Sequence, residues 1–232
     1  MKTIGLLGGM SWESTVLYYQ LLNEGVRKRL GGLHSAKILM HSVDFADIEQ
    51  FQVNGEWQQA GEQLAAAAAG LEQAGAEMIL LCTNLMHKVA PLIEAEIEVP
   101  FLHIADASGH AIKAQGLKKV GLLGTRYTME EDFYRQRLLD KYNLDVVIPD
   151  QEDRDYVHQV IFSELCLGKF TPESRANYLA IIDKLRDQGA EGVILGCTEI
   201  PLLVRQEDTD LPLFNTAALH AEYALEYSFV GE

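Results

Sequence analysis

Residues 189–199 read Gly-Ala-Glu-Gly-Val-Ile-Leu-Gly-Cys-Thr-Glu, an apolar run bounded by glycines that ends in a thiol, a hydroxyl and a carboxylate. The continuous hydrophobicity of residues 193–195 is typical of a strand buried on both faces in a parallel α/β sheet. In such sheets, ligands bind beyond the carboxyl ends of the strands. We therefore expect Cys197 to lie at a binding site at the end of a strand.

A similar stretch occurs earlier in the chain, where residues 75–84 read Gly-Ala-Glu-Met-Ile-Leu-Leu-Cys-Thr-Asn. Aligning the two Gly-Ala-Glu triplets without a gap matches Thr83 with Cys197. Matching Cys82 with Cys197 instead would break the register of the apolar runs. Because strand side chains alternate between faces, this one-residue difference decides which side chain faces the site. We expect Thr83 to be the partner of Cys197, and Cys82 to lie in the core.

Two further landmarks also repeat. Residues 4–9 (Ile-Gly-Leu-Leu-Gly-Gly) recur at 120–125 (Val-Gly-Leu-Leu-Gly-Thr), and residues 99–102 (Val-Pro-Phe-Leu) recur at 211–214 (Leu-Pro-Leu-Phe). The repeated segments keep their order along the chain, which indicates an internal duplication.

The alternation of apolar strands with helical stretches is the βαβ pattern of a parallel sheet. The expected fold class is α/β, with two pseudo-symmetric Rossmann-like domains, each a parallel sheet flanked by helices, and the active site in the cleft between them. We expect residues 1–107 plus 212–232 to form the first domain and residues 108–211 to form the second.

Local composition predicts several elements. A helix is expected from Ser11, whose hydroxyl can cap it, to about residue 30, and the alanine-rich stretch 57–73 is helical on propensity. Residues 41–52 are expected to end a strand and form a loop. The helical stretch 156–167 carries Cys166, which we expect in the core.

Composition excludes several classes of protein and ligand. The 232-residue chain has a formal charge of -15 at pH 7, which argues against nucleic acid or an anionic membrane surface as a partner. No run approaches the roughly 18 apolar residues of a membrane span, and no secretion signal precedes the first strand. Three cysteines without metal or disulfide spacing fit a cytoplasmic protein. The cysteine spacing gives no reason to expect a metal, and because the glycines of residues 5–9 do not match the dinucleotide fingerprint, no cofactor is expected either.

Two similar halves would each carry a strand-end site, formed by Met10, Ser11, Thr83 and Asn84 in one half and by Thr125, Cys197, Thr198 and Glu199 in the other. Two opposed side chains that exchange protons suit removal of a proton from one face of a carbon and its return on the other, which is racemisation or epimerisation. A thiolate near its ordinary pKa of about 8.5 is a usable base. Hydroxyl and backbone donors at the helix starts can hold a carboxylate whose charge grows in the transition state.

These residues also have structural interpretations. Cys197 could be a core thiol, and Thr83 could cap the helix that follows it. His87 could be a packed histidine, and Glu199 could cap a helix start rather than receive a substrate ammonium group. Lys169, in a loop between helices, could be simply solvated.

Three motifs resemble the signatures of the aspartate/glutamate racemase family: Gly-Gly-Met-Ser-Trp-Glu-Ser-Thr at 8–15, Thr-Asn-Leu-Met-His at 83–87, and Gly-Cys-Thr-Glu at 196–199. The resemblance covers essentially the whole chain. It implies two pseudo-symmetric domains, a two-base mechanism that needs no pyridoxal phosphate, and a homodimer. In the family the first base is normally a cysteine followed by Asn, with His three residues beyond that Asn. Here Thr83 stands in the place of that thiol.

The resemblance also guides the expected substrate. In aspartate-specific relatives the loop after the second strand offers an arginine to the side-chain carboxylate, whereas residues 41–52 contain none. Gln52 is the best polar candidate there, and the family's mobile lysine corresponds approximately to Lys169. Because an amide binds a carboxylate less strongly than a guanidinium does, we expect turnover of aspartate or glutamate and also of neutral substrates such as homoserine or glutamine. The expected substrate-binding residues are Met10, Ser11, Gln52, Asn84, Leu85, Thr125, Lys169, Thr198 and Glu199.

Other functions remain as alternatives. Maleate isomerases, hydantoin racemases and arylmalonate decarboxylases of the wider superfamily share the cleft and differ in substrate. A non-catalytic binding protein for small molecules belongs to a different class. A dithiol redox protein is disfavoured because the chain has no Cys-x-x-Cys motif.

Overall fold

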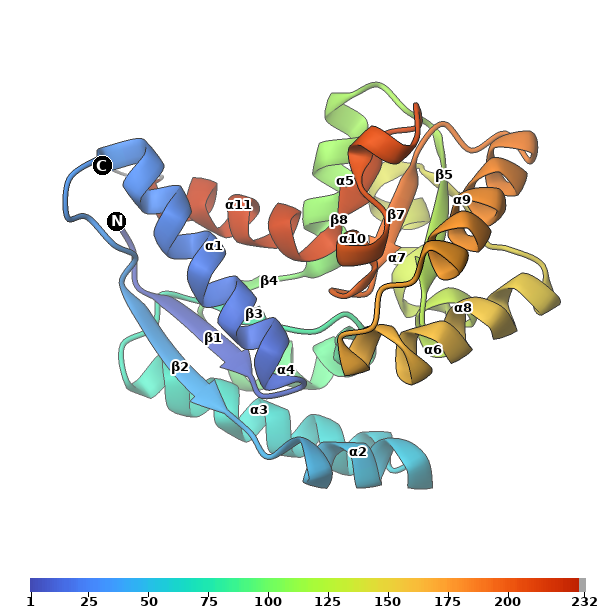
Figure 1. The fold of residues 1–232 in the computed structure, drawn as a ribbon. Coiled ribbons are helices and arrows are strands. Elements are labelled where there is room, and N and C mark those ends of the chain that lie inside the picture. The colour runs from blue at the N-terminus through green and yellow to red at the C-terminus, as the bar shows by residue number, and fades with distance from the viewer. Residues whose placement is uncertain (230–232) are drawn as a thin grey trace. The chain divides into compact units, whose positions relative to one another are not determined.

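A computed structural model of the chain describes residues 1–229 and divides it into two compact units. Among the described residues, unit 1 comprises residues 1–104 and 217–229, and unit 2 comprises Ala105–Thr216. Each unit is built on one four-stranded parallel sheet flanked by helices, as the repeated strand motifs predict (Figure 1). No helix in the described part of the chain is long and apolar enough to cross a membrane.

The sheet of unit 1 has the strand order β2-β1-β3-β4. Its strands are β1 (Ile4–Gly8), β2 (Ile38–Ser42), β3 (Met78–Leu81) and β4 (Phe101–Leu102). The helical elements around it are α1 (Trp12–Leu30), α2 (Phe45–Asn54), α3 (Trp57–Gln73), η1 (Leu85–Val89), α4 (Ala90–Glu96) and α11 (Thr216–Phe229).

Both faces of this sheet are covered, and the alternation of side chains along β1 and β3 divides the core in two. On one face Leu7 and Ile79 pack against Leu64 of α3. On the other face Leu6 and Leu80 pack with residues of α1 and α11. Figure 1 shows α1 and α3 on opposite sides of the β1 strand. Burial on both faces explains why the central strands are continuously apolar in sequence.

The sheet of unit 2 repeats this topology, with the strand order β6-β5-β7-β8. Its strands are β5 (Lys119–Gly124), β6 (Asp145–Val147), β7 (Val193–Gly196) and β8 (Leu213–Asn215). The helical elements are α5 (Ile104–Ala114), α6 (Arg126–Glu130), α7 (Asp132–Tyr142), α8 (Gln151–Ser163), η2 (Leu165–Leu167), α9 (Pro172–Asp187), α10 (Ile200–Leu203) and η3 (Gln206–Asp208).

The edge strand β8 lies in the second sheet because it pairs in parallel with β7, Leu213 lying opposite Val193. The boundaries expected from the sequence placed residues 105–107 and 212–216 in the first domain, whereas both segments group with unit 2. The chain therefore returns to unit 1 only after its last strand, at the start of α11.

Two local expectations differ from the structure. The stretch 41–52 is not a loop beyond its strand, because Asp44 accepts a hydrogen bond from the Ala46 backbone N–H at 3.0 Å and caps α2. Gly55 ends that helix in the left-handed conformation, with φ 73°. Cys166 is exposed rather than buried, because it lies in the short turn η2 beyond the end of α8.

Candidate active site

The two central strands of each sheet, β1 with β3 in unit 1 and β5 with β7 in unit 2, pair in the same register. The first glycine of the repeated strand motif lies opposite Ile79 in unit 1 and opposite Val193 in unit 2. Thr83 stands at the same distance beyond Ile79 as Cys197 stands beyond Val193. This register agrees with the ungapped sequence alignment that matches Thr83 with Cys197. It makes Cys82 the equivalent of Gly196.

Cys82 belongs to the core, as expected. It is fully buried in the apolar cluster that includes Leu80 and Tyr18. Burial raises the pKa of its thiol far above the ordinary range. A thiol in this environment stays protonated and unreactive.

Thr83 is half-buried in a tight turn after β3. Its backbone N–H donates to the Leu81 carbonyl at 2.9 Å, and its carbonyl lies 2.8 Å from Nδ1 of His87. The residue at the cap position of η1 is Asn84, and no side-chain cap hydrogen bond is formed there. The interpretation of Thr83 as a helix cap is therefore wrong. Asn84 is buried, and Leu85 begins η1.

The segment after β1 is held by the side chain of Thr15. Its hydroxyl oxygen accepts a hydrogen bond from the Gly9 N–H at 2.8 Å, and the hydroxyl donates to the Ser11 carbonyl at 3.0 Å. Gly9 has φ 96°, and a Cβ there would overlap the backbone of Val43. Ser11 caps α1 as expected, and Met10 is buried. The sequence analysis did not predict that Thr15 holds this segment, although Thr15 stands four residues after the capping Ser11.

Gln52 lies on α2 rather than on a loop, and it is half-buried. Its side-chain amide donates to Sδ of Met86 at 3.0 Å. Met86 lies in the helical turn that directly follows Thr83 and Asn84. The structure of unit 1 therefore brings Gln52 beside that segment.

In unit 2, Thr125 follows β5 and caps α6, accepting a hydrogen bond from the Thr128 N–H at 3.5 Å. The two threonine hydroxyls lie 3.2 Å apart. A Cβ on Gly124 would crowd the Gly196 carbonyl at 3.1 Å. The ends of β5 and β7 therefore lie close together, which brings Thr125 near the segment that begins at Cys197.

The carboxylate of Glu199 accepts two hydrogen bonds on one oxygen. Sγ of Cys197 donates at 2.9 Å and Oγ1 of Thr198 donates at 2.8 Å. Glu199 occupies the cap position of α10 without a side-chain cap hydrogen bond, so the interpretation of its carboxylate as a helix cap is wrong. Cys197 is half-buried against the core cluster of unit 2 and is not a fully enclosed core thiol.

The environment of Cys197 raises the pKa of its thiol well above the ordinary value. Desolvation is the largest cause, although the residue keeps some exposed surface, and the charge and hydrogen bond of Glu199 add to it. The expectation of a thiol pKa near its ordinary value is therefore wrong. The raised pKa favours the protonated thiol, which donates its hydrogen bond to Glu199.

Lys169 lies on an exposed loop between η2 and α9, and its backbone N–H donates to the Glu164 carbonyl at 3.0 Å. A contact of its ammonium group with substrate remains a prediction.

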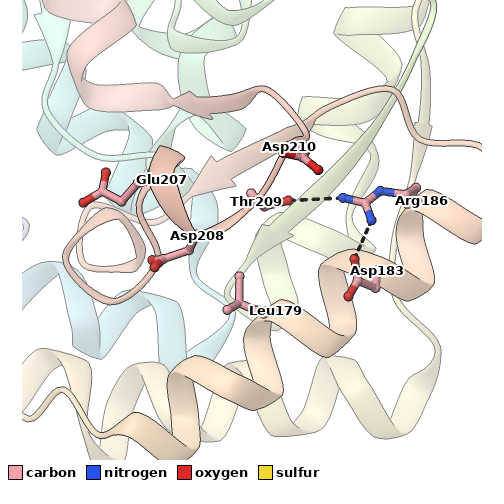
Figure 2. Close-up of a pocket in the computed structure, with 7 residues that line it drawn as sticks. All are labelled: Leu179, Asp183, Arg186, Glu207, Asp208, Thr209 and Asp210. Carbon is pink, nitrogen blue, oxygen red and sulfur yellow. Dashed lines mark hydrogen bonds and ion pairs between the residues drawn. The ribbon is translucent and has the colours of Figure 1, made fainter.

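Two surface hollows of unit 2 are lined by none of the predicted site residues. The first, of about 240 Å³, is largely acidic, and Figure 2 shows Arg186 between the carboxylate of Asp183 at 2.9 Å and the hydroxyl of Thr209 at 3.3 Å. Its other lining residues are Leu179, Glu207, Asp208 and Asp210. The second, of about 350 Å³, lies at the start of α9 and is lined by Phe170, Thr171, Pro172, Arg175, Ala176 and Leu179.

Comparison with known proteins shows extensive similarity. The family model described as Asp/Glu/hydantoin racemase matches residues 7–224. A solved structure from Yersinia pestis, provisionally described as an Asp/Glu racemase, is 54% identical and superposes with a TM-score of 0.95, covering 98% of this chain and 99% of that chain.

Two more distant proteins are also similar over nearly their whole length. An aspartate racemase homologue from Pyrococcus horikoshii is 36% identical with a TM-score of 0.89, covering 98% of this chain and 99% of that chain. A broad-specificity amino-acid racemase of Bacillus subtilis is 23% identical over 221 residues, which are 94% of this chain and 95% of that protein. With a family model that spans nearly all of its length, the chain belongs to the Asp/Glu/hydantoin racemase family.

Proposed function

We propose that this protein is a pyridoxal-phosphate-independent amino-acid racemase in which Thr83 and Cys197 exchange protons with opposite faces of the substrate α-carbon. Family membership supports amino-acid racemase chemistry. The observation that carries the assignment of the two bases is the shared register, which gives Thr83 and Cys197 the same place at the carboxyl end of the third strand of each sheet. Ligands of parallel α/β sheets bind at this end of the strands.

In the direction that begins at Cys197, the thiol first gives its proton to Glu199, which already accepts its hydrogen bond. The thiolate then removes the α-proton, and the electron pair left on the α-carbon is delocalised into the substrate carboxylate. The hydroxyl of Thr83 supplies a proton to the opposite face. Glu199 releases its proton to solvent and Thr83 regains one, so that no net proton is consumed.

The proposed substrate contacts are those of the expected binding residues. Asn84, Leu85 and Thr198 stand beside the two bases in sequence and would hold the carboxylate whose charge grows in the transition state. Ser11 and Thr125 cap the helices that begin at the same sheet edges. Met10, which precedes Ser11, would line the substrate site at the sheet edge of unit 1.

The proposed substrates are aspartate and glutamate together with neutral amino acids of similar length, such as homoserine. The neutral amide of Gln52, held by Met86 beside the Thr83 segment, supports weak discrimination by side-chain charge. Lys169 would add a point charge from its loop. The names of two relatives, an aspartate racemase homologue and a broad-specificity amino-acid racemase, agree with this range. We further propose that the protein acts as a homodimer in the cytoplasm.

The experiment that tests this function is incubation of purified, cofactor-free protein with a panel of L-amino acids in deuterated water. We expect D-product and deuterium at the α-carbon for at least one acidic and one neutral polar substrate. Cys197→Ala should abolish formation of the D-product, whereas Cys166→Ala, which removes an exposed thiol of the same unit, should keep both signals. A hydantoin is tested alongside the amino acids. If no amino acid gives either signal and the hydantoin is turned over, the protein has another activity of the family.

A further inference from the structure

His87 is a buried histidine whose two ring nitrogens have opposite roles. The backbone N–H of Ile104 donates to Nε2 at 3.2 Å, so Nε2 must be the unprotonated nitrogen. Nδ1 therefore carries the hydrogen and donates to the carbonyl of Thr83 at 2.8 Å. With both nitrogens used in this way and only 1% of the residue exposed, the ring is neutral and fixed in one orientation.

These two bonds join the ends of neighbouring strands. Thr83 follows β3, and Ile104 follows β4, the edge strand beside it. The ring also lies against His103, with a centroid distance of 4.4 Å, and against Phe101 at 5.5 Å. The imidazole of His87 therefore connects the backbone after β4, at Ile104, to the turn after β3 that contains Thr83, the proposed base.

The bond to the Thr83 carbonyl also fixes the peptide group between Thr83 and Asn84. A trans peptide is planar and its C=O and N–H point in opposite directions. Because the Thr83 carbonyl points toward the buried ring, the N–H of Asn84 points away from it. One hydrogen bond from His87 therefore sets the orientation of a peptide group shared by a proposed base and a proposed substrate-binding residue.

We propose that His87 is a positioning residue that holds the Thr83 hydroxyl in line with the substrate α-carbon through its Nδ1–H bond to the Thr83 carbonyl. This inference rests on the proposed function, in which Thr83 delivers a proton to one face of the substrate. His87 itself touches neither substrate nor the reacting atoms. The bond to Ile104 orients the ring, and the bond to Thr83 transmits that orientation to the turn.

If loss of the hydrogen bond from His87 displaces Thr83, we expect a specific catalytic defect. For the enantiomer whose α-proton faces Cys197, removal of the proton continues, and Cys197 can return deuterium to the same face. Inversion fails because the opposite face receives no proton. The ratio of in-place α-deuteration to inversion therefore rises, and this ratio does not depend on the amount of folded enzyme. A misplacement of about 1 Å costs roughly a hundredfold in rate, so we expect a rise of about 10- to 100-fold.

The experiment measures this ratio for both enantiomers of the best substrate in His87→Asn, His87→Gln and His87→Ala. Asparagine places an N–H donor where Nδ1 lies and keeps the bond to Thr83. Glutamine reaches the position of Nε2 and keeps only an acceptor for Ile104. The same substitutions at His34 are the controls, because this histidine of unit 1 is exposed and lies on the loop before β2, whereas His220 packs against the His87 ring at a centroid distance of 5.8 Å and is unsuitable as a control.

We expect the ratio to rise for one enantiomer in His87→Gln and His87→Ala, to stay near wild type in His87→Asn, and to stay unchanged in the His34 variants. Equal loss of exchange and inversion in His87→Gln would overturn the proposal, as would a His87→Asn variant that behaves like His87→Gln. If His87→Ala does not fold, the Asn and Gln pair decides the question alone. Thr83→Ala in the same assay tests the proposed function separately: inversion at the wild-type rate there would remove Thr83 from the mechanism whatever the His87 variants do.

Discussion

Replacement of Glu199 by Gln should make the Cys197 thiol easier to ionise. The carboxylate of Glu199 favours the protonated thiol in two ways, by its negative charge and by accepting the Sγ hydrogen bond at 2.9 Å, and both raise the pKa. A hydrogen bond to a charged group contributes about 1 to 1.5 kcal/mol more than one to a neutral group. Loss of that difference increases the thiolate fraction about five- to tenfold at a pH below the pKa.

The assay is the rate of alkylation of Cys197 by iodoacetamide against pH, with peptide mapping, in a Cys166→Ser background that removes the exposed thiol. A less basic thiolate is also less nucleophilic, so we expect a rate gain of only about two- to fourfold and a profile displaced to lower pH. Glu207→Gln, which neutralises an exposed carboxylate of the same unit, should leave the profile unchanged. An unchanged or more alkaline profile in Glu199→Gln would refute the assigned role of Glu199. Racemisation should nevertheless fall, because the variant lacks the proton acceptor.

Three further substitutions have defined outcomes. Thr83→Cys should make the kinetic constants and solvent isotope effects of the two directions more alike, because a thiol is a far stronger acid than an alcohol; identical constants already present in the wild type would contradict this. Gln52→Arg should raise the catalytic efficiency for aspartate and glutamate relative to homoserine and glutamine, and no change would show that another residue sets the preference. Gly9→Ala should lower the free energy of unfolding in urea by about 1–3 kcal/mol or more, because φ is positive and the new Cβ overlaps Val43. Gly31→Ala, at a positive φ with open space around it, should cost less.

The sequence predicts the central strands of the two sheets well because these strands are buried on both faces, whereas the edge strand β6 was not predicted. The repeated glycines and apolar runs determine which residues pair, and the equivalence of Thr83 with Cys197 follows from counting along them. The long helices were also predictable, and the expected bounds of α3 agree with the structure. These features depend on local composition and on a repeat, both of which can be read from one chain.

Features that depend on tertiary contacts were not predictable. Cys166 was expected in the core from its residue type, but its exposure depends on where α8 ends. The raised pKa of Cys197 depends on desolvation and on a carboxylate two residues away whose direction the sequence does not give. The positioning role proposed for His87 depends on its contact with Ile104, which is distant in sequence. Helix α2, which carries Gln52, was not predicted although it could have been, because its capping Asp44 and its terminal Gly55 are both visible in the sequence.

The most direct test of the two-base account is the exchange of the α-proton with deuterated water, measured separately for each enantiomer in Thr83→Ala and in Cys197→Ala. The account predicts that Thr83→Ala deuterates one enantiomer in place and inverts neither, since Cys197 still serves one face. It predicts that Cys197→Ala no longer deuterates that same enantiomer. Inversion by either variant at the wild-type rate, or deuteration of both enantiomers by Thr83→Ala, would contradict the assignment of these two residues to opposite faces of the substrate.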